Sequence, residues 1–121
     1  MIITKDILIE KCACKDGLDF MEENNLYNMD SQDLALKLLE LKESNYFIWF
    51  TENFKIKDTK SMRDKITDSY SAYRYCQYVK DRKEMRNKIT DSDSAYLYCR
   101  YTSKKDKRLN ELAKQFKKGV L

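Results

Sequence analysis

A tandem repeat is the feature of this 121-residue sequence that most constrains its fold. Residues 62–79 read MRDKITDSYSAYRYCQYV and residues 85–102 read MRNKITDSDSAYLYCRYT, with 13 of the 18 aligned positions identical. The offset of 23 residues is typical of one supersecondary unit that stacks on its neighbour. The repeat predicts an architecture and no function, because function depends on the surface that a scaffold presents.

The scarcity of chain-breaking residues favours an all-α fold. The sequence has no proline and only two glycines, Gly17 and Gly119, whereas Lys, Glu and Leu are frequent. All-β folds need turn glycines, which are missing here. At 42% apolar and 36% charged residues, we expect residues 1–121 to form a single folded domain with a modest core.

The first 55 residues are predicted to form an acidic, aromatic-rich helical part. Thr4 is a suitable N-cap for a helix over residues 5–11, and a second helix is expected over residues 15–23. Gly17 lies inside that helix, where it indicates close approach of another backbone or a helix junction. Asn24 and Asn25 tolerate the left-handed conformation that ends a helix, and residues 26–29 are predicted to be a loop.

The clearest helical pattern is SQDLALKLLELK, residues 31–42, which Asp30 or Ser31 would cap. Leu34, Leu38 and Leu41 lie at helical spacing, and Ala35 and Leu39 widen this apolar face. The aromatic cluster that follows, residues 45–54, is predicted to be the centre of the core. Its members are Tyr46, Phe47, Trp49, Phe50 and Phe54.

Residues 56–121 are predicted to form basic helical repeats, with units at 62–84 and 85–107. Each unit would hold a short helix (62–66, then 85–89) and a second helix (69–80, then 92–103). Asp68 and Asp91 are the expected N-caps of the second helices, because aspartate accepts a backbone N–H there. The packing residues would be Met62, Ile66, Ala72, Tyr75, Cys76 and their counterparts.

Residues 107–118 have the pattern of a basic amphipathic helix, which would cap the last repeat. The predicted architecture is therefore a solenoid-like array of short helical hairpins with a C-terminal amphipathic capping helix.

Charge is distributed unevenly along the chain. Residues 1–55 carry 6 basic and 11 acidic groups, and residues 56–121 carry 18 basic and 9 acidic groups. Such a split indicates a charged partner for one of the two halves, although a lysine-rich helical face can also simply be solvated. The N-terminal segment lacks the features of a signal peptide, and no apolar stretch is long enough to span a membrane. We therefore expect a cytosolic protein with reduced cysteines.

Catalytic and metal-binding patterns are missing from the sequence. The chain has no histidine, which excludes Ser-His-Asp and Cys-His catalysis, and no glycine-rich phosphate loop. Cys12 and Cys14 do not have the usual zinc-knuckle spacing, while Cys76 and Cys99 suit small buried positions too far apart for a disulfide. We expect no enzymatic activity, no cofactor and no metal.

Tyrosine and basic residues are interleaved in the repeats, where seven of the nine tyrosines fall within residues 70–101. This combination suits protein interfaces and single-stranded nucleic acids equally. Tyr73, Tyr75, Tyr96 and Tyr98 are expected to pack between repeats, with Tyr78 and Tyr101 outside. The predicted partner-binding set is Arg74, Tyr78, Arg82, Arg86, Arg100 and Tyr101.

The repeats resemble short α-helical repeats of phage and prophage proteins. The resemblance is carried by Asp68-Ser69, Ala72-Tyr73 and Tyr75-Cys76, and by the matching residues of the second copy, Asp91-Ser92, Ala95-Tyr96 and Tyr98-Cys99-Arg100. Cysteine replaces the usual alanine, and serine replaces the proline that often follows the cap. The segment KCACKDGLDFMEENN also resembles the opening motif of such proteins.

This resemblance implies a phage-encoded protein acting in the cytoplasm of a bacterial host, and no catalytic residue carries over. Small phage proteins without enzymatic motifs are often inhibitors of host complexes, anti-CRISPR proteins included. The leading hypothesis is a non-enzymatic module that blocks a host protein or ribonucleoprotein complex such as a CRISPR effector. Its acidic half would mimic nucleic acid, or its basic repeat face would dock on the complex. The alternative is a nucleic-acid-binding module that uses the same basic face.

Overall fold

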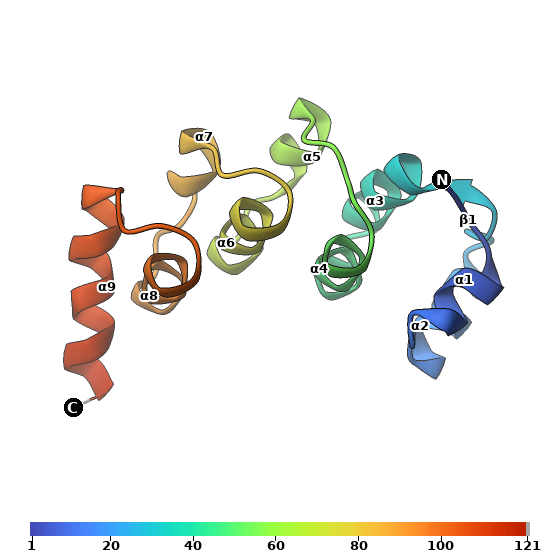
Figure 1. Ribbon diagram of the computed structural model, residues 1–121, viewed down its shortest axis with the longest axis horizontal. Coiled ribbons are helices and arrows are strands. Elements are labelled where there is room, and N and C mark those ends of the chain that lie inside the picture. Colours follow the sequence, from blue (N-terminus) through green and yellow to red (C-terminus); the bar gives the residue numbers. More distant parts are fainter. Residues whose placement is uncertain (121) are drawn as a thin grey trace. The chain divides into compact units, whose positions relative to one another are not determined.

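The computed structural model describes the backbone of residues 1–120 and the side chains of residues 1–116. Within this range the chain is predominantly helical, as its composition predicts (Figure 1). It divides into two compact units, Met1–Lys57 and Asp58–Leu121, close to the boundary expected from the change in charge. We call them unit 1 and unit 2. That residues 1–121 form a single domain stays a prediction. No helix in the described part of the chain is long and apolar enough to cross a membrane.

Unit 1 contains four helices and a two-stranded ribbon within its described residues. The helices are α1 (Lys5–Glu10), α2 (Lys15–Glu23), α3 (Ser31–Glu40) and α4 (Ser44–Asn53). Thr4 and Asp30 cap α1 and α3 as predicted, because each side-chain oxygen accepts a backbone N–H of the first turn. Asn25 has a φ of 54° and takes the left-handed conformation expected after α2.

The ribbon corrects the prediction that residues 26–29 form only a loop. Strand β1 (Ile2–Ile3) pairs antiparallel with β2 (Met29–Asp30), and Ile3 is fully buried. The terminal amine lies 3.1 Å from the Asp30 carboxylate. A pairing between segments so far apart in the chain leaves no local periodicity, which is why the sequence did not predict it.

The aromatic cluster is only partly in the core. Phe47, Phe50 and Phe54 are buried, and the leucine face of α3 is buried with them. Tyr46 and Trp49 are only half-buried, so the prediction that the whole cluster is the core centre is wrong for these two.

The interpretation of Gly17 is also wrong. No helix junction occurs there, because α2 runs from Lys15 to Glu23. A Cβ at Gly17 would meet side chains rather than another backbone, namely Cys14 Sγ at 3.5 Å and Tyr46 Cε1 at 3.9 Å.

Unit 2 contains α5 (Lys60–Lys65), α6 (Ser69–Tyr78), α7 (Lys83–Arg86), α8 (Ser92–Tyr101) and α9 (Lys107–Val120). Asp68 and Asp91 cap α6 and α8 through bonds of 2.9 and 2.7 Å to the N–H of Ser71 and Ser94, which confirms their predicted role. Both helices end two residues earlier than predicted. The short helices α5 and α7 each begin two residues earlier than predicted, and they end one and three residues earlier, respectively.

The repeat residues pack as their shared positions predict. In the first copy the buried residues include Met62, Ile66, Ala72, Tyr75 and Cys76; in the second they include Met85, Ile89, Ala95 and Tyr98. Cys99 differs from Cys76 in being half-buried. Helix α6 packs on α7 and α8, and α8 packs on α9, which buries Leu109 and Ala113 (Figure 1).

Candidate interaction surface

The structure divides the six predicted binding residues into two groups. The first group is on α6 and α8, where each arginine lies beside a tyrosine ring: Arg74 is half-buried, and Tyr78, Arg100 and Tyr101 are exposed. Arg82 and Arg86 form ion pairs with aspartates of unit 2. The two groups therefore have different chemistry, although the sequence presents them as one basic pattern.

Helix α6 carries a row of tyrosine and arginine residues with a spacing of four. The guanidinium carbon of Arg74 lies 4.7 Å from the ring centre of Tyr78 and 5.9 Å from that of Tyr70. Residues four apart share one helix face, so these three side chains form a continuous strip. Tyr70 and Tyr78 are 43% and 40% exposed. Tyr70 was not in the predicted set, yet its spacing from Arg74 could have revealed it.

Helix α8, which packs on α6, carries a second tyrosine–arginine group. The Arg100 guanidinium lies 5.4 Å from the Tyr101 ring centre and donates a 3.1 Å hydrogen bond to the Tyr96 hydroxyl. Tyr101 is the most exposed tyrosine of the described chain, at 56%. We call Tyr70, Arg74, Tyr78, Arg100 and Tyr101 the Tyr/Arg surface.

Tyr73 of α6 is buried, and its ring centre lies 5.9 Å from that of Tyr70. Burial raises its pKa to about 12, and Tyr70, Tyr78 and Tyr101 act in the same direction. Exposed tyrosines of both helices are therefore within electrostatic range of one buried phenol. The expectation that Tyr73, Tyr75 and Tyr98 pack inside is confirmed, whereas Tyr96 is half-buried against Phe116.

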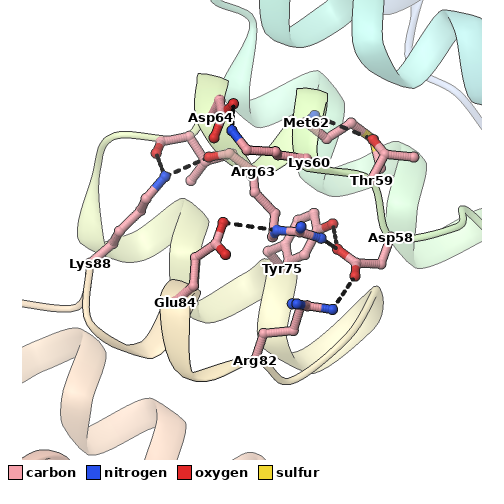
Figure 2. A network of polar contacts seen from close by, with 11 residues as sticks. Asp58, Thr59, Lys60, Met62, Arg63, Asp64, Tyr75, Arg82, Glu84 and Lys88 are labelled. Atoms are coloured by element: carbon pink, nitrogen blue, oxygen red, sulfur yellow. Dashed lines mark hydrogen bonds and ion pairs between the residues drawn. The ribbon is translucent and has the colours of Figure 1, made fainter.

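Arg82 belongs to a polar network around Asp58, which Figure 2 shows. The Asp58 carboxylate accepts hydrogen bonds from the Tyr75 hydroxyl, from Arg63 Nη1 at 2.5 Å and from Arg82 Nη1 at 3.1 Å. Arg63 Nε also donates to Glu84 at 2.9 Å. With Asp58 only 11% exposed, three donors around one carboxylate compensate for its loss of water.

A second cluster of the same residue types occurs 23 positions later. The Asp81 carboxylate accepts bonds of 2.7 Å from the Tyr98 hydroxyl and 2.9 Å from Arg86 Nη1. Arg86 Nε donates to Asp106 at 3.1 Å, much as Arg63 does to Glu84. We call these two groups the Asp58 and Asp81 clusters.

The clusters shift the pKa values of their members. Burial would raise the pKa of Asp58, but the hydrogen bonds from Tyr75 and Arg63 outweigh it and lower the value. Burial raises the pKa of Tyr75 and of Tyr98, and the neighbouring aspartates add to both shifts. Hydrogen bonds to Asp58 and Glu84 raise the pKa of Arg63. At neutral pH Asp58 is therefore ionised, and the phenols of Tyr75 and Tyr98 are neutral.

These clusters were missed by the sequence interpretation. It assigned the first unit to residues 62–84, which leaves Asp58 in the preceding connector and separates it from Tyr75. The signal was present, because Lys57-Asp58 and Met62-Arg63 recur as Lys80-Asp81 and Met85-Arg86. The repeat therefore begins about five residues before the boundary that identity alone indicated.

Lysine and arginine side chains bind backbone carbonyl oxygens at helix ends in unit 2. Lys88 Nζ donates to the carbonyl oxygens of Arg63 and Ile66, at the end of α5. Arg108 donates to the carbonyls of Arg86 and Ile89, the residues 23 positions later. The carbonyls at a helix end need such partners, and a cation also suits the negative end of the helix dipole.

The Asp58 and Asp81 clusters are suited to stabilising unit 2, and the Tyr/Arg surface is suited to binding a partner. The carboxylates of the two clusters are occupied by phenol and guanidinium donors of the same unit. Within the described residues, no three Cys, Asp or Glu side chains are arranged to hold a metal ion. The Tyr/Arg surface offers exposed tyrosine rings and the exposed Arg100 instead, with the half-buried Arg74 between two of the rings.

Comparison with protein-family models finds no match, and no curated protein or solved structure matches the chain.

Proposed function

We propose that this protein is a non-enzymatic, phage-encoded inhibitor that binds a host defence complex, such as a CRISPR effector, through its Tyr/Arg surface. The observation that carries the binding mode is the row Tyr70–Arg74–Tyr78 on α6 together with Arg100 and Tyr101 on α8. Tyrosine and arginine are the residue types enriched in protein interfaces. The phage origin and the class of partner rest on the resemblance of the repeats alone.

Two features support a protein partner for this surface. Stacking on tyrosine rings orders the two guanidinium groups before binding, which lowers the entropy cost of an interface. Unit 2 carries 17 basic and 9 acidic groups, so an acidic partner surface would complement it. Arg82 and Arg86 add to this positive charge. Their contacts with Asp58 and Asp81 indicate that they mainly stabilise the fold of unit 2.

We also propose that unit 2 is a stack of two helical hairpins, α5–α6 and α7–α8, with α9 covering the second. The support is the recurrence of the Asp58 cluster as the Asp81 cluster. The same carbonyl positions are also bound by Lys88 in one copy and by Arg108 in the next. In such a stack the Tyr/Arg surface is the outer face of the second helices.

Affinity capture tests the inhibitor proposal. The immobilised chain is exposed to lysate of bacteria that carry defined defence systems, and retained proteins are identified by mass spectrometry. We expect subunits of one defence complex to be enriched by the wild-type chain and at least tenfold less by Arg74→Glu/Arg100→Glu. The matched control is Lys65→Glu/Lys105→Glu, which changes net charge equally at exposed positions off α6 and α8.

Capture of no defence complex would contradict the inhibitor proposal. Equal capture by both double variants, with unchanged circular dichroism, would contradict the surface assignment. Arg82 is left unchanged in this experiment, because its reversal would place a carboxylate beside Asp58 and test the fold instead.

The second candidate function is binding of single-stranded nucleic acid, which the exposed rings beside guanidinium groups favour. A gel-shift titration across salt concentrations distinguishes it. Phosphate binding weakens steeply as salt rises, so a shift at low salt that vanishes at high salt and in Arg74→Glu/Arg100→Glu would support it. A chain that shifts no oligonucleotide at low salt excludes this candidate.

A further inference from the structure

Unit 1 contains an apolar cavity of about 200 Å³ among α1, α2, α3 and α4. Four aromatic side chains contribute to its wall: Phe20, Tyr46, Trp49 and Phe50. Phe20, Tyr46 and Trp49 are half-buried, so the cavity opens to the surface between their rings. A dry cavity of about 150 Å³ already holds a benzene-sized molecule, so this one can take a small organic group.

Gly17 keeps one wall of the cavity open. A Cβ there would lie in ordinary van der Waals contact with Cys14 Sγ and Tyr46 Cε1, which both line the cavity. A methyl group would therefore fit without a clash and would occupy part of the space. Alanine stabilises a helix more than glycine does, so Gly17 lowers the stability of α2. In return, its missing side chain leaves room in the cavity.

Three carboxylates, which we call the rim carboxylates, act on Tyr46, a side chain that lines the cavity. Burial raises the pKa of the Tyr46 phenol, Cys14 raises it further, and so do the charges of Glu43, Asp16 and Glu23. Asp16 and Glu23 are exposed. Lys15, the cation next to Asp16, is paired with Asp19 at 2.8 Å. The surroundings of Tyr46, on one side of this apolar cavity, are therefore negative.

We propose that the cavity binds a small organic cation with an apolar body, such as an arylalkyl ammonium ion. The apolar body would fill the space beside Gly17, and the cation would lie among the ring faces and the rim carboxylates. Aromatic faces attract cations, and a negative rim strengthens this attraction where water is displaced. This site lies in unit 1 and does not rest on the proposed function, whose surface lies in unit 2.

Trp49 provides a direct reporter, because it lines the cavity and is the only tryptophan of the sequence. The full chain is titrated at neutral pH with phenethylammonium chloride while tryptophan emission is recorded. The comparison probes are 2-phenylethanol and 3-phenylpropionate, which have similar apolar bodies and carry no charge or a negative charge. We expect saturable binding of the cation, at least tenfold weaker binding of the alcohol and none of the carboxylate.

Two variants separate the roles of shape and charge. Gly17→Ala should weaken all binding by at least tenfold while keeping the helical circular dichroism of the wild type. Asp16→Asn/Glu43→Gln should weaken cation binding and leave alcohol binding unchanged. Asp6→Asn/Glu10→Gln is the matched control, since it removes two exposed carboxylates of α1 that are not among those acting on Tyr46.

The proposal is overturned if no probe gives a saturable change in emission, or if the alcohol binds as tightly as the cation. Wild-type affinity in a folded Gly17→Ala chain would overturn it as well.

Discussion

Tyr75 and Tyr98 occupy equivalent positions in the two repeat copies, but their hydrogen bonds should contribute unequally to stability. Each hydroxyl donates to an aspartate, but the Asp58 side chain is 11% exposed and that of Asp81 is 32% exposed. Water can replace a lost donor more easily at Asp81. The hydrogen bond of Tyr75 should therefore contribute more to stability than that of Tyr98.

We expect Tyr75→Phe to lower the free energy of unfolding by about 1.5–3 kcal/mol, the range for hydrogen bonds to charged groups. Tyr98→Phe should cost less, and the exposed Tyr101→Phe should stay within about 0.5 kcal/mol of wild type. Urea denaturation followed by circular dichroism measures all three. An effect of Tyr75→Phe no larger than that of Tyr101→Phe would contradict the assigned role of the Asp58 cluster.

Asp58 should also make stability depend on pH in the acid range. Because hydrogen bonding lowers its pKa in the folded state, the unfolded chain binds more protons, and the free energy of unfolding rises with pH. The contribution of Asp58 should be complete above about pH 5 and be lost as pH falls through its lowered folded pKa.

Urea denaturation between pH 3 and 6 checks this dependence. The free energy of unfolding of Asp58→Asn should change less steeply with pH than that of wild type. Asp93→Asn is the control, because it removes one exposed carboxylate elsewhere in unit 2. Parallel slopes for wild type and Asp58→Asn would refute the linkage.

At the scale of elements, the short helices α5 and α7 need partners that their own residues do not supply. Helices of six and four residues are too short to be stable alone. Each is held by one buried methionine, Met62 or Met85, and by a cation from further along the chain. Figure 2 shows Lys88 reaching the end of α5 in this way.

We expect Lys88→Met, which keeps the apolar stem and removes the ammonium group, to destabilise unit 2 by about 1–3 kcal/mol. Two carbonyl oxygens would lose their donor. Lys80→Met is the control, because Lys80 is exposed. Thermal denaturation of both variants gives the comparison, and equal midpoints would show that the carbonyl contacts contribute nothing.

At the scale of the whole molecule, each unit has its own buried residues. The Asp58 and Asp81 clusters, the carbonyl contacts of Lys88 and Arg108 and the apolar core around Tyr75 all lie within Asp58–Leu121. A segment with its own core can fold alone.

We therefore expect a fragment of residues 58–121 to unfold cooperatively, with Tyr75→Phe destabilising it as much as in the full chain. A fragment of residues 81–121, which lacks α5 and α6, is near the length of about 40 residues below which a core is rarely sufficient, and should not unfold cooperatively. Circular dichroism in urea tests both. A gradual transition for residues 58–121 would show that unit 2 depends on residues 1–57.

Much of the fold could be predicted, but the candidate site only in part. Tyr78 and Tyr101 were correctly expected to be exposed, because they lie off the apolar stripe of their helices. Nothing in the local pattern distinguishes Arg74 from Arg82, and their difference depends on Asp58, which lies 24 residues before Arg82. The same limit applies to Trp49, which is half-buried at the cavity although its neighbours Phe47 and Phe50 are buried.

The sequence by itself determined the helical class of the chain, the N-caps of α1, α3, α6 and α8, and the packing stripe of the repeats. These depend on contacts within about four residues and on a period of 3.6, which a single stretch of chain specifies. Only the tertiary structure decided the pairing of β1 with β2, the donors around Asp58, the cations at the ends of α5 and α7, and the cavity beside Gly17. Those features join residues from separate elements, and their geometry depends on how the elements pack rather than on local preference.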